Sequence, residues 1–176
     1  EYSMIGFSDE MAADLQLSSH QTSQVMSAYA MGVLIGAPVL AILGSKLNRH
    51  TLLAYLLLWC ASANFFTSFA QSYEQLRLLR VFNGFPHGIY FSTAALLIYD
   101  LFPKHKRASY IGVMFSGIGM ALIMAVPFNT WVGELQGWRY MYRFMALIDL
   151  LSLGLLHNLS PALPLQHQSS LSQGFR

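Results

Sequence analysis

Long apolar stretches alternate with short polar segments along most of the chain. A helix that crosses a membrane needs about 20 consecutive, mostly apolar residues. Four stretches of this kind, 22–44, 51–69, 81–99 and 108–133, contain no Asp, Glu, Lys or Arg. The pattern predicts an all-α membrane protein, a bundle of six transmembrane helices of which the first is truncated. The predicted spans cover about 1–7, 22–44, 51–70, 76–102, 108–133 and 138–159.

Charged residues are sorted between the connecting loops. Two alternate loops carry the basic residues Lys46, Arg49, Lys104, Lys106 and Arg107. The other loops carry the acidic residues Asp9, Glu10, Asp14, Glu74 and Glu134. The positive-inside rule makes the basic loops cytoplasmic. Segment 8–21 is then an external loop, and the polar segment 160–176 is a disordered cytoplasmic tail.

The composition excludes several classes of protein. Charged residues make up only 10% of the chain, against about 25% in soluble domains. Cys60 is the single cysteine, which excludes a disulfide framework and a cysteine metal site. The six histidines show no metal-ligand spacing, and no phosphate-binding loop is present. Basic residues lie at the ends of the spans, which disfavours nucleic-acid binding. We expect no metal and no cofactor.

Small residues and prolines recur inside the spans. The set comprises Gly32, Gly36, Pro38, Gly84, Pro86, Gly88, Gly117 and Pro127. Small residues four positions apart let membrane helices approach closely, and a proline removes a backbone hydrogen bond and bends a helix. One interpretation is plain helix packing. The other is that bent helices rock during transport.

Several segments resemble the major facilitator superfamily of transporters. The segment from Arg80 to Gly88 reads Arg-Val-Phe-Asn-Gly-Phe-Pro-His-Gly and resembles the fourth-helix motif of its proton-coupled members. Segment 29–38 resembles the second helix of the sugar-efflux, arabinose-efflux-like branch of the drug:proton antiporters. Segment 116–130 resembles the fifth-helix antiporter motif, and Gly-Trp-Arg at 137–139 resembles the start of the sixth helix. The ordered set covers roughly 1–159, which corresponds to the N-terminal half of a twelve-helix fold.

The sequence also departs from the family pattern. The loop after the second helix holds Ser45, Lys46 and Arg49, a candidate cytoplasmic gating loop, but lacks the usual Asp. In the fifth-helix motif, Ala125 and Asn129 stand where the family has glycines. These departures put an aspartate-based latch and an easily bent fifth helix in doubt.

Ionisable groups inside membrane spans are costly and mark functional sites. Four residues are candidates for proton or substrate translocation: Glu1, Arg80, His87 and Asp149. The resemblance implies that Arg80 pairs with an acid and modulates its pKa, and Glu1 is an acid that could carry the driving proton. Each has a structural alternative: Arg80 could snorkel to the interface, His87 could be a packing histidine, and Asp149 could be a neutral hydrogen-bonded group.

The resemblance implies proton-coupled efflux of a sugar or drug-like solute by alternating access across a bacterial inner membrane. Its partners would be lipid, protons, the solute and a missing C-terminal six-helix half, or instead a second copy in a homodimer. The alternative is a truncated, non-transporting remnant or an interaction protein. An enzyme is disfavoured, because the intramembrane-protease Gly-x-Ser-Gly sequence is incomplete at Ser116. The paired Asn-Pro-Ala turns of a water channel are also absent from the sequence.

Overall fold

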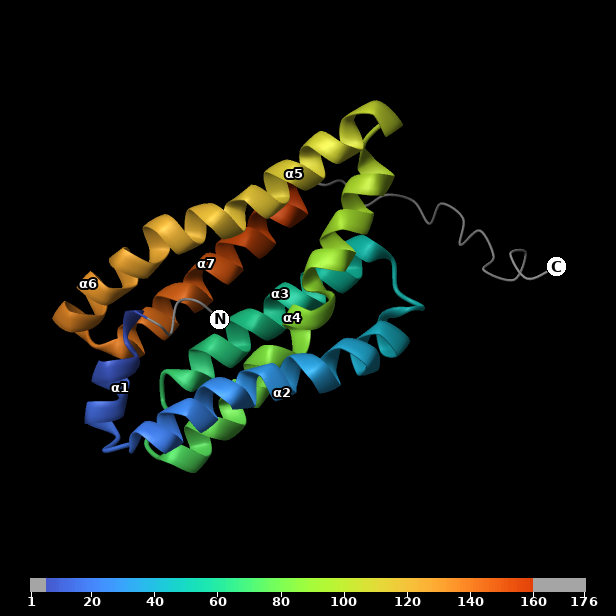
Figure 1. Ribbon diagram of the computed structural model, residues 1–176. Helices are drawn as coiled ribbons and strands as arrows, with labels where there is room; N and C mark the ends of the chain where they lie inside the picture. The colour runs from blue at the N-terminus through green and yellow to red at the C-terminus, as the bar shows by residue number, and fades with distance from the viewer. Residues whose placement is uncertain (1–5, 160–176) are drawn as a thin grey trace.

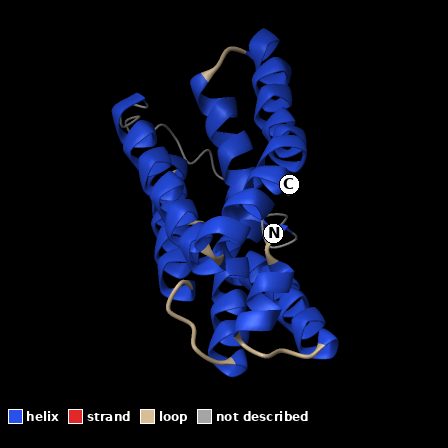
Figure 2. Ribbon diagram, turned by 90° about the vertical axis from the view of Figure 1, so that its left-hand side faces the viewer, coloured by secondary structure: helices blue, strands red, loops and turns tan. Residues whose placement is uncertain are grey.

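A computed structural model describes residues 6–159, and within this range every regular element is helical (Figures 1 and 2). The elements are α1 (Ser8–Asp14), α2 (Ser19–Gly44), α3 (Arg49–Thr67), α4 (Tyr73–Leu101), α5 (Lys104–Met120), the π-helix η2 (Ala121–Ala125), α6 (Val126–Gln136) and α7 (Trp138–Leu159). The short helix α1 lies in the segment expected to be only a loop. Residue Glu1 and the tail 160–176 lie outside the described residues.

Polar caps define where the long helices begin. The side chain of Ser18 accepts a hydrogen bond from the backbone N–H of Gln21, and the side-chain oxygen of Gln21 accepts one from the backbone N–H of Ser18. Together they form a capping box for α2. Helices α3 and α4 have simpler caps: the side chain of Asn48 accepts one backbone hydrogen bond at the start of α3, and that of Ser72 does so at the start of α4. Gly137 separates α6 from α7 at φ 83°, a conformation that other residues adopt only with strain.

The long helices α2, α3, α4, the continuous stretch from α5 to α6, and α7 alternate in direction along the chain, and their loops fall at two ends of the molecule (Figure 1). The loops α2–α3 and α4–α5, which carry the basic residues, lie at one end, whereas α1 and the turn α6–α7 lie at the other. Helix α2 packs along α4, and α3 packs against both α4 and α7. The sorting of loop charges is therefore also a sorting in space.

A buried hydrophobic cluster lies at the end of the molecule that holds α1 and the α6–α7 turn, which is called the acidic end below. Its largest fully buried members are Trp138, Tyr142, Phe7, Met11 and Leu76. The ring of Phe7 meets Tyr142 edge to face at 5.5 Å between centroids, and Trp138 meets Tyr142 at 5.9 Å. This cluster joins the N-terminal residues to the start of α7 and to α4.

Helix α5, η2 and α6 form one continuous arm that runs along the outside of the bundle (Figure 1). Neither α5 nor η2 contains a buried residue, whereas α6 buries Asn129, Val132 and Gly133 beside the N-terminal residues. The π-helix ends at Ala125, immediately before Val126 and Pro127. Because proline has no N–H, the regular α-helical hydrogen bonds cannot continue through this point.

Two helices among the described residues are long and apolar enough to cross a membrane by length and composition: Ser19–Gly44 and the continuous arm Lys104–Gln136. Helix α4 is longer than α2 but carries polar residues in its middle, among them Asn83 and His87. Helix α7 carries Arg143 and Asp149. Five of the six predicted spans therefore correspond to described helices, which are of unequal apolar character. Residues 1–5 of the first predicted span lie outside the described residues, so the six-span arrangement stays a prediction.

Candidate functional site

The side chain of Arg80 is enclosed between three helices. It is 4% exposed, and its guanidinium carbon lies 4.6 Å from the centre of the Tyr29 ring on α2. Its Nη1 atom donates a long hydrogen bond of 3.4 Å to the hydroxyl of Tyr142 on α7. Its Nε atom has no hydrogen-bond partner among residues 6–159. The cation is thus held by a ring face and one weak hydrogen bond, and its buried Nε donor is unpaired among residues 6–159.

His87 lies near the same tyrosine. The His87 and Tyr29 rings meet edge to face at 5.7 Å, and the His87 and Phe91 rings do so at 5.3 Å. Residues 80 and 87 are about two helical turns apart, so they lie on one side of α4. The structure therefore brings Arg80 and His87 to one aromatic residue of the neighbouring helix.

Backbone contact between α2 and α4 places Tyr29 beside Arg80. A Cβ atom built on Gly32 would lie 2.1 Å from the carbonyl oxygen of Val81, and one on Gly84 would lie 2.2 Å from that of Tyr29. No side chain fits at these distances. The second pair of glycines continues the contact: Gly36 meets the backbone of Phe85, and Gly88 meets Ala37.

Helix α4 contains Pro86, and a partner from α3 compensates for the hydrogen bond that it lacks. In an α-helix the N–H of residue 86 would bond to the carbonyl of Phe82, but proline has no N–H. The indole Nε1 of Trp59 donates to that carbonyl at 2.9 Å. The Trp59 ring also stacks on Phe85, with 5.9 Å between centroids. Pro38, by contrast, is exposed on α2.

Two further polar pairs join α3 to its neighbours. Asn83 of α4 donates to the hydroxyl of Thr67 at 2.9 Å, and both residues are buried. Asn64 of α3 donates to the carboxylate of Asp149 on α7 at 2.8 Å. Asp149 follows Tyr142 by two turns of α7, so it belongs to a second polar position along that helix and not to the Arg80 position.

The residues of the expected gating loop have different surroundings. Arg49 forms an ion pair of 2.5 Å with Asp100 at the end of α4, and it also donates to the carbonyl of Leu96 at 3.1 Å. Ser45 bonds to the carbonyl of Ile42, and Lys46 is exposed. An acid from α4 therefore stands opposite the basic loop that lacks its own aspartate.

A second ion pair lies at the acidic end of the molecule, where it joins α1 to α7. Asp14, which ends α1, accepts hydrogen bonds from Arg139 and from the Trp138 indole. The hydrogen bond from Arg139 lowers the pKa of the Asp14 carboxyl below its usual 3.8. Partial burial raises this pKa and so opposes the shift, whereas the hydrogen bond from Trp138 lowers it further. Arg77, near the same end, is exposed and lies 3.8 Å from Glu74.

Sequence reasoning did not single out Tyr29, Tyr142, Thr67 or Asp100 as site residues. Tyr29 opens the segment whose glycines indicated close packing, which was the one signal that could have pointed to it. The others are single residues on distant helices, without a local pattern. The packing and bending expected of Gly117 and Pro127 stay predictions, because Gly117 has no neighbouring atom within 4 Å of a built Cβ.

Comparison with known proteins gives one consistent family. The uncharacterized MFS-type transporter YtbD of Bacillus subtilis is 32% identical over 152 residues, which cover 86% of this chain and 38% of YtbD. The inner membrane transport protein YdhP of Escherichia coli is 33% identical over 153 residues, which cover 87% of this chain and 39% of YdhP. A Mannheimia succiniciproducens protein named "Probable sugar efflux transporter" is 25% identical over 171 residues, 97% of this chain and 43% of that protein.

The chain therefore spans about two fifths of the length of these relatives, between 38% and 43%. Residues 2–171 also match the sequence profile of the Major Facilitator Superfamily. Matched over nearly all of its length, this membrane protein belongs to the Major Facilitator Superfamily.

Proposed function

We propose that the chain is the N-terminal half of a proton-coupled exporter of a sugar or drug-like solute, working by alternating access in a bacterial inner membrane. The observation that carries this proposal is Arg80, a cation 4% exposed with an unused Nε donor. Ionisable residues inside membrane proteins are costly, face the interior and mark ion or substrate pathways. The name of the Mannheimia relative supports efflux of a sugar.

The proposed role of Arg80 is to bind a negatively charged or oxygen-rich partner. A carboxylate beside it, either Glu1 or an acid of the second half, would be held ionised by the guanidinium. Protonation of that acid would release Arg80 for the solute, which couples proton binding to solute binding. His87 would share the pathway through Tyr29, which both side chains contact. Asp149, bonded to Asn64, would be a separate proton position.

The exposed arm formed by α5, η2 and α6 supports the assignment of this chain as one half of a larger helix bundle. Ser116 and Gly117 on α5 are exposed, and Gly112, Gly117 and Gly119 have no neighbour within 4 Å of a built Cβ. Small residues of this kind pack against other helices in membranes. We propose that a C-terminal six-helix half packs there. A homodimer is less favourable, because it would place two Arg80 cations around one cavity.

The test compares two arginines of α4 in the full-length transporter. The protein is reconstituted in proteoliposomes with an imposed proton gradient, and efflux is measured for a panel of labelled monosaccharides and ethidium. Arg80→Ala is expected to lower gradient-driven transport by roughly tenfold or more, since an interaction with a charged group contributes about 1.5–3 kcal/mol. Arg77→Ala, which removes an exposed cation, should retain transport. Equal activity of the two variants would refute the proposed role of Arg80.

The chain 1–176 alone is expected to transport none of these solutes. Gradient-dependent movement by it alone would favour the homodimer. Failure of the full-length protein with every solute in the panel would favour a non-transporting interaction protein.

A further inference from the structure

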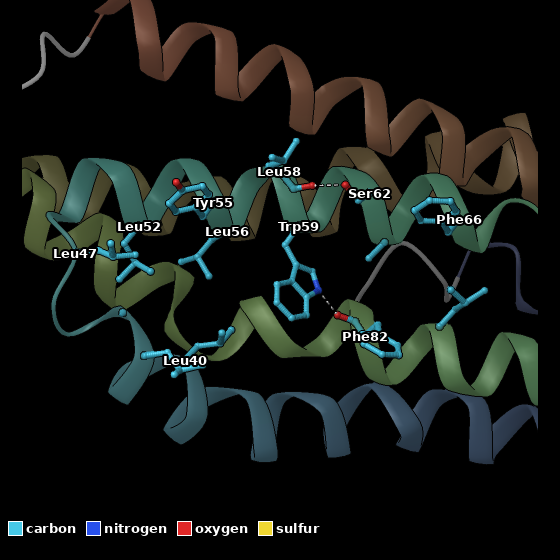
Figure 3. Close-up of a pocket in the computed structure, with 14 residues that line it drawn as sticks. Leu40, Leu47, Leu52, Tyr55, Leu56, Leu58, Trp59, Ser62, Phe66 and Phe82 are labelled. Carbon is cyan, nitrogen blue, oxygen red and sulfur yellow. Dashed lines mark hydrogen bonds between the residues drawn. The ribbon is translucent and has the colours of Figure 1, made fainter.

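A wide apolar groove lies between α3 on one side and α2 and α4 on the other (Figure 3). Its volume is about 660 Å³, which falls within the usual range for ligand sites. The side chains that define it include Leu43, Leu47, Tyr55, Trp59, Phe66 and Phe82. None of the groups used in the proposed transport function lines it, so this groove is distinct from the Arg80 position.

Two of the polar side chains along the groove, Trp59 and Ser62, are already engaged. The Trp59 indole donates to the carbonyl of Phe82 at 2.9 Å, and the Ser62 hydroxyl donates to the carbonyl of Leu58 at 2.8 Å (Figure 3). An occupant therefore finds hydrocarbon surface and no free donor on these two side chains. Such a lining fits an apolar chain and not a polar solute.

The size of the lining side chains distinguishes a lipid from another helix. Helix contacts in membranes use small residues, as Gly32 and Gly84 do between α2 and α4. The groove instead presents large, exposed side chains: Leu43 is 67% exposed, Phe66 59% and Tyr55 57%. A flexible hydrocarbon chain can fill the uneven space between such side chains, which favours a lipid acyl chain as the occupant.

One end of the groove is basic. Gly44 and Leu47 both line it, and the exposed Lys46 lies between them in the α2–α3 loop. The neighbouring cation Arg49 is occupied by Asp100. Lys46 is therefore the ammonium group available at this mouth, on the side that the charge sorting assigns to the cytoplasm. Anionic lipids attract basic groups at this membrane surface.

We propose that the groove binds one acyl chain of an anionic phospholipid of the cytoplasmic leaflet, with its phosphate held by Lys46. The acyl chain extends from Leu47 past Tyr55 and Trp59 towards Phe66. Trp59 forms part of the wall and at the same time supports α4 at Pro86. The bound lipid thus covers the apolar surface beside the bend of α4.

Trp59 provides the readout. The full-length protein, in which Trp131 and every tryptophan outside residues 1–176 are replaced by Phe, is reconstituted in phosphatidylcholine vesicles. Its tryptophan fluorescence is titrated with phosphatidylglycerol that bears bromine atoms on its acyl chains. Trp131 is removed because it is 60% exposed, whereas Trp138 is 2% exposed beside Asp14 at the other end. Brominated phosphatidylglycerol is expected to quench Trp59 with about fivefold higher relative affinity than brominated phosphatidylcholine, the contribution of one lysine at an anionic surface.

Three variants test the parts of the site. Lys46→Gln should remove the preference for phosphatidylglycerol, while Lys106→Gln, a basic residue of the other loop at this end, should leave it unchanged. Ser62→Phe, which fills the groove, should reduce quenching by both lipids. The proposal is overturned if neither brominated lipid quenches Trp59, which would mean that protein covers the groove. It is equally overturned if the parent shows no headgroup preference, or if Lys106→Gln loses as much of it as Lys46→Gln.

Discussion

The α2–α4 pair and the α5 arm carry the same sequence signal and have different surroundings. Glycines four residues apart occur in α2 at 32 and 36 and in α4 at 84 and 88, and α5 has Gly112 followed by Ser116. In the first pair the backbones touch, so that no Cβ fits at Gly32 or Gly84. In α5 a Cβ at Gly112 would meet nothing within 4 Å. Small residues at this spacing permit close packing, but close packing occurs only where a second helix lies against them.

The largest difference between the two regions should appear on substitution of Gly84. Gly84→Ala places a methyl group 2.2 Å from the Tyr29 carbonyl, so α2 and α4 must separate. We expect a loss of about 3 kcal/mol of unfolding free energy, at the upper end for an overpacked site. Denaturant titration in detergent micelles measures it. A change below about 1 kcal/mol would contradict the backbone contact.

The support of Pro86 by Trp59 gives a smaller, sharper test of the same pair. Trp59→Phe leaves the Phe82 carbonyl without its indole donor, and we expect this lost hydrogen bond to cost about 1 kcal/mol in unfolding free energy. In a Pro86→Ala background, the alanine N–H can donate to the Phe82 carbonyl in place of the indole. Trp59→Phe should therefore lower the unfolding free energy by about 1 kcal/mol less in this background than in the parent. A double-mutant cycle isolates this coupling, and additive effects would argue against it.

In the arm, Gly117→Ala should act in the opposite direction from Gly84→Ala. A Cβ at Gly117 meets no atom within 4 Å, and alanine is more favourable than glycine inside a helix by about 0.5–1 kcal/mol. We expect the isolated chain to keep or slightly gain stability in the same titration. In the full-length transporter the substitution should instead reduce transport, if the proposed second half packs on α5.

The smallest expected effect concerns the acidic end, where α1 is tied to α7. The pKa of the Asp14 carboxyl is lower in the folded chain than its usual 3.8. The carboxylate therefore makes its full contribution to the unfolding free energy when the pH is above about 3.8. That contribution declines as the pH falls through the folded pKa. The group is largely exposed, so the effect should stay below about 0.5 kcal/mol. Comparing the melting temperature of the parent and Asp14→Asn at about pH 6 and pH 3 tests this: the difference should shrink at the lower pH.

Much of the candidate site could be predicted from local sequence, and the rest could not. Arg80 and His87 stand out because charged or polar residues are rare within apolar segments, and their spacing places them on one side of α4. Tyr29, Tyr142 and Asp100 could not be predicted, since their roles depend on residues 51, 62 and 51 positions away along the chain. Nothing in a local pattern specifies such contacts.

The sequence by itself determined the helical class, the sorting of charges to two ends, and the family. These follow from the length of apolar runs, from loop composition and from an ordered set of motifs, all of which are local or additive along the chain. Tertiary structure alone decided which glycines touch a neighbour, that Trp59 supports the carbonyl freed by Pro86, and that Arg80 is enclosed by Tyr29 and Tyr142. The physical reason is that these are contacts between helices, and they exist only once the helices have packed.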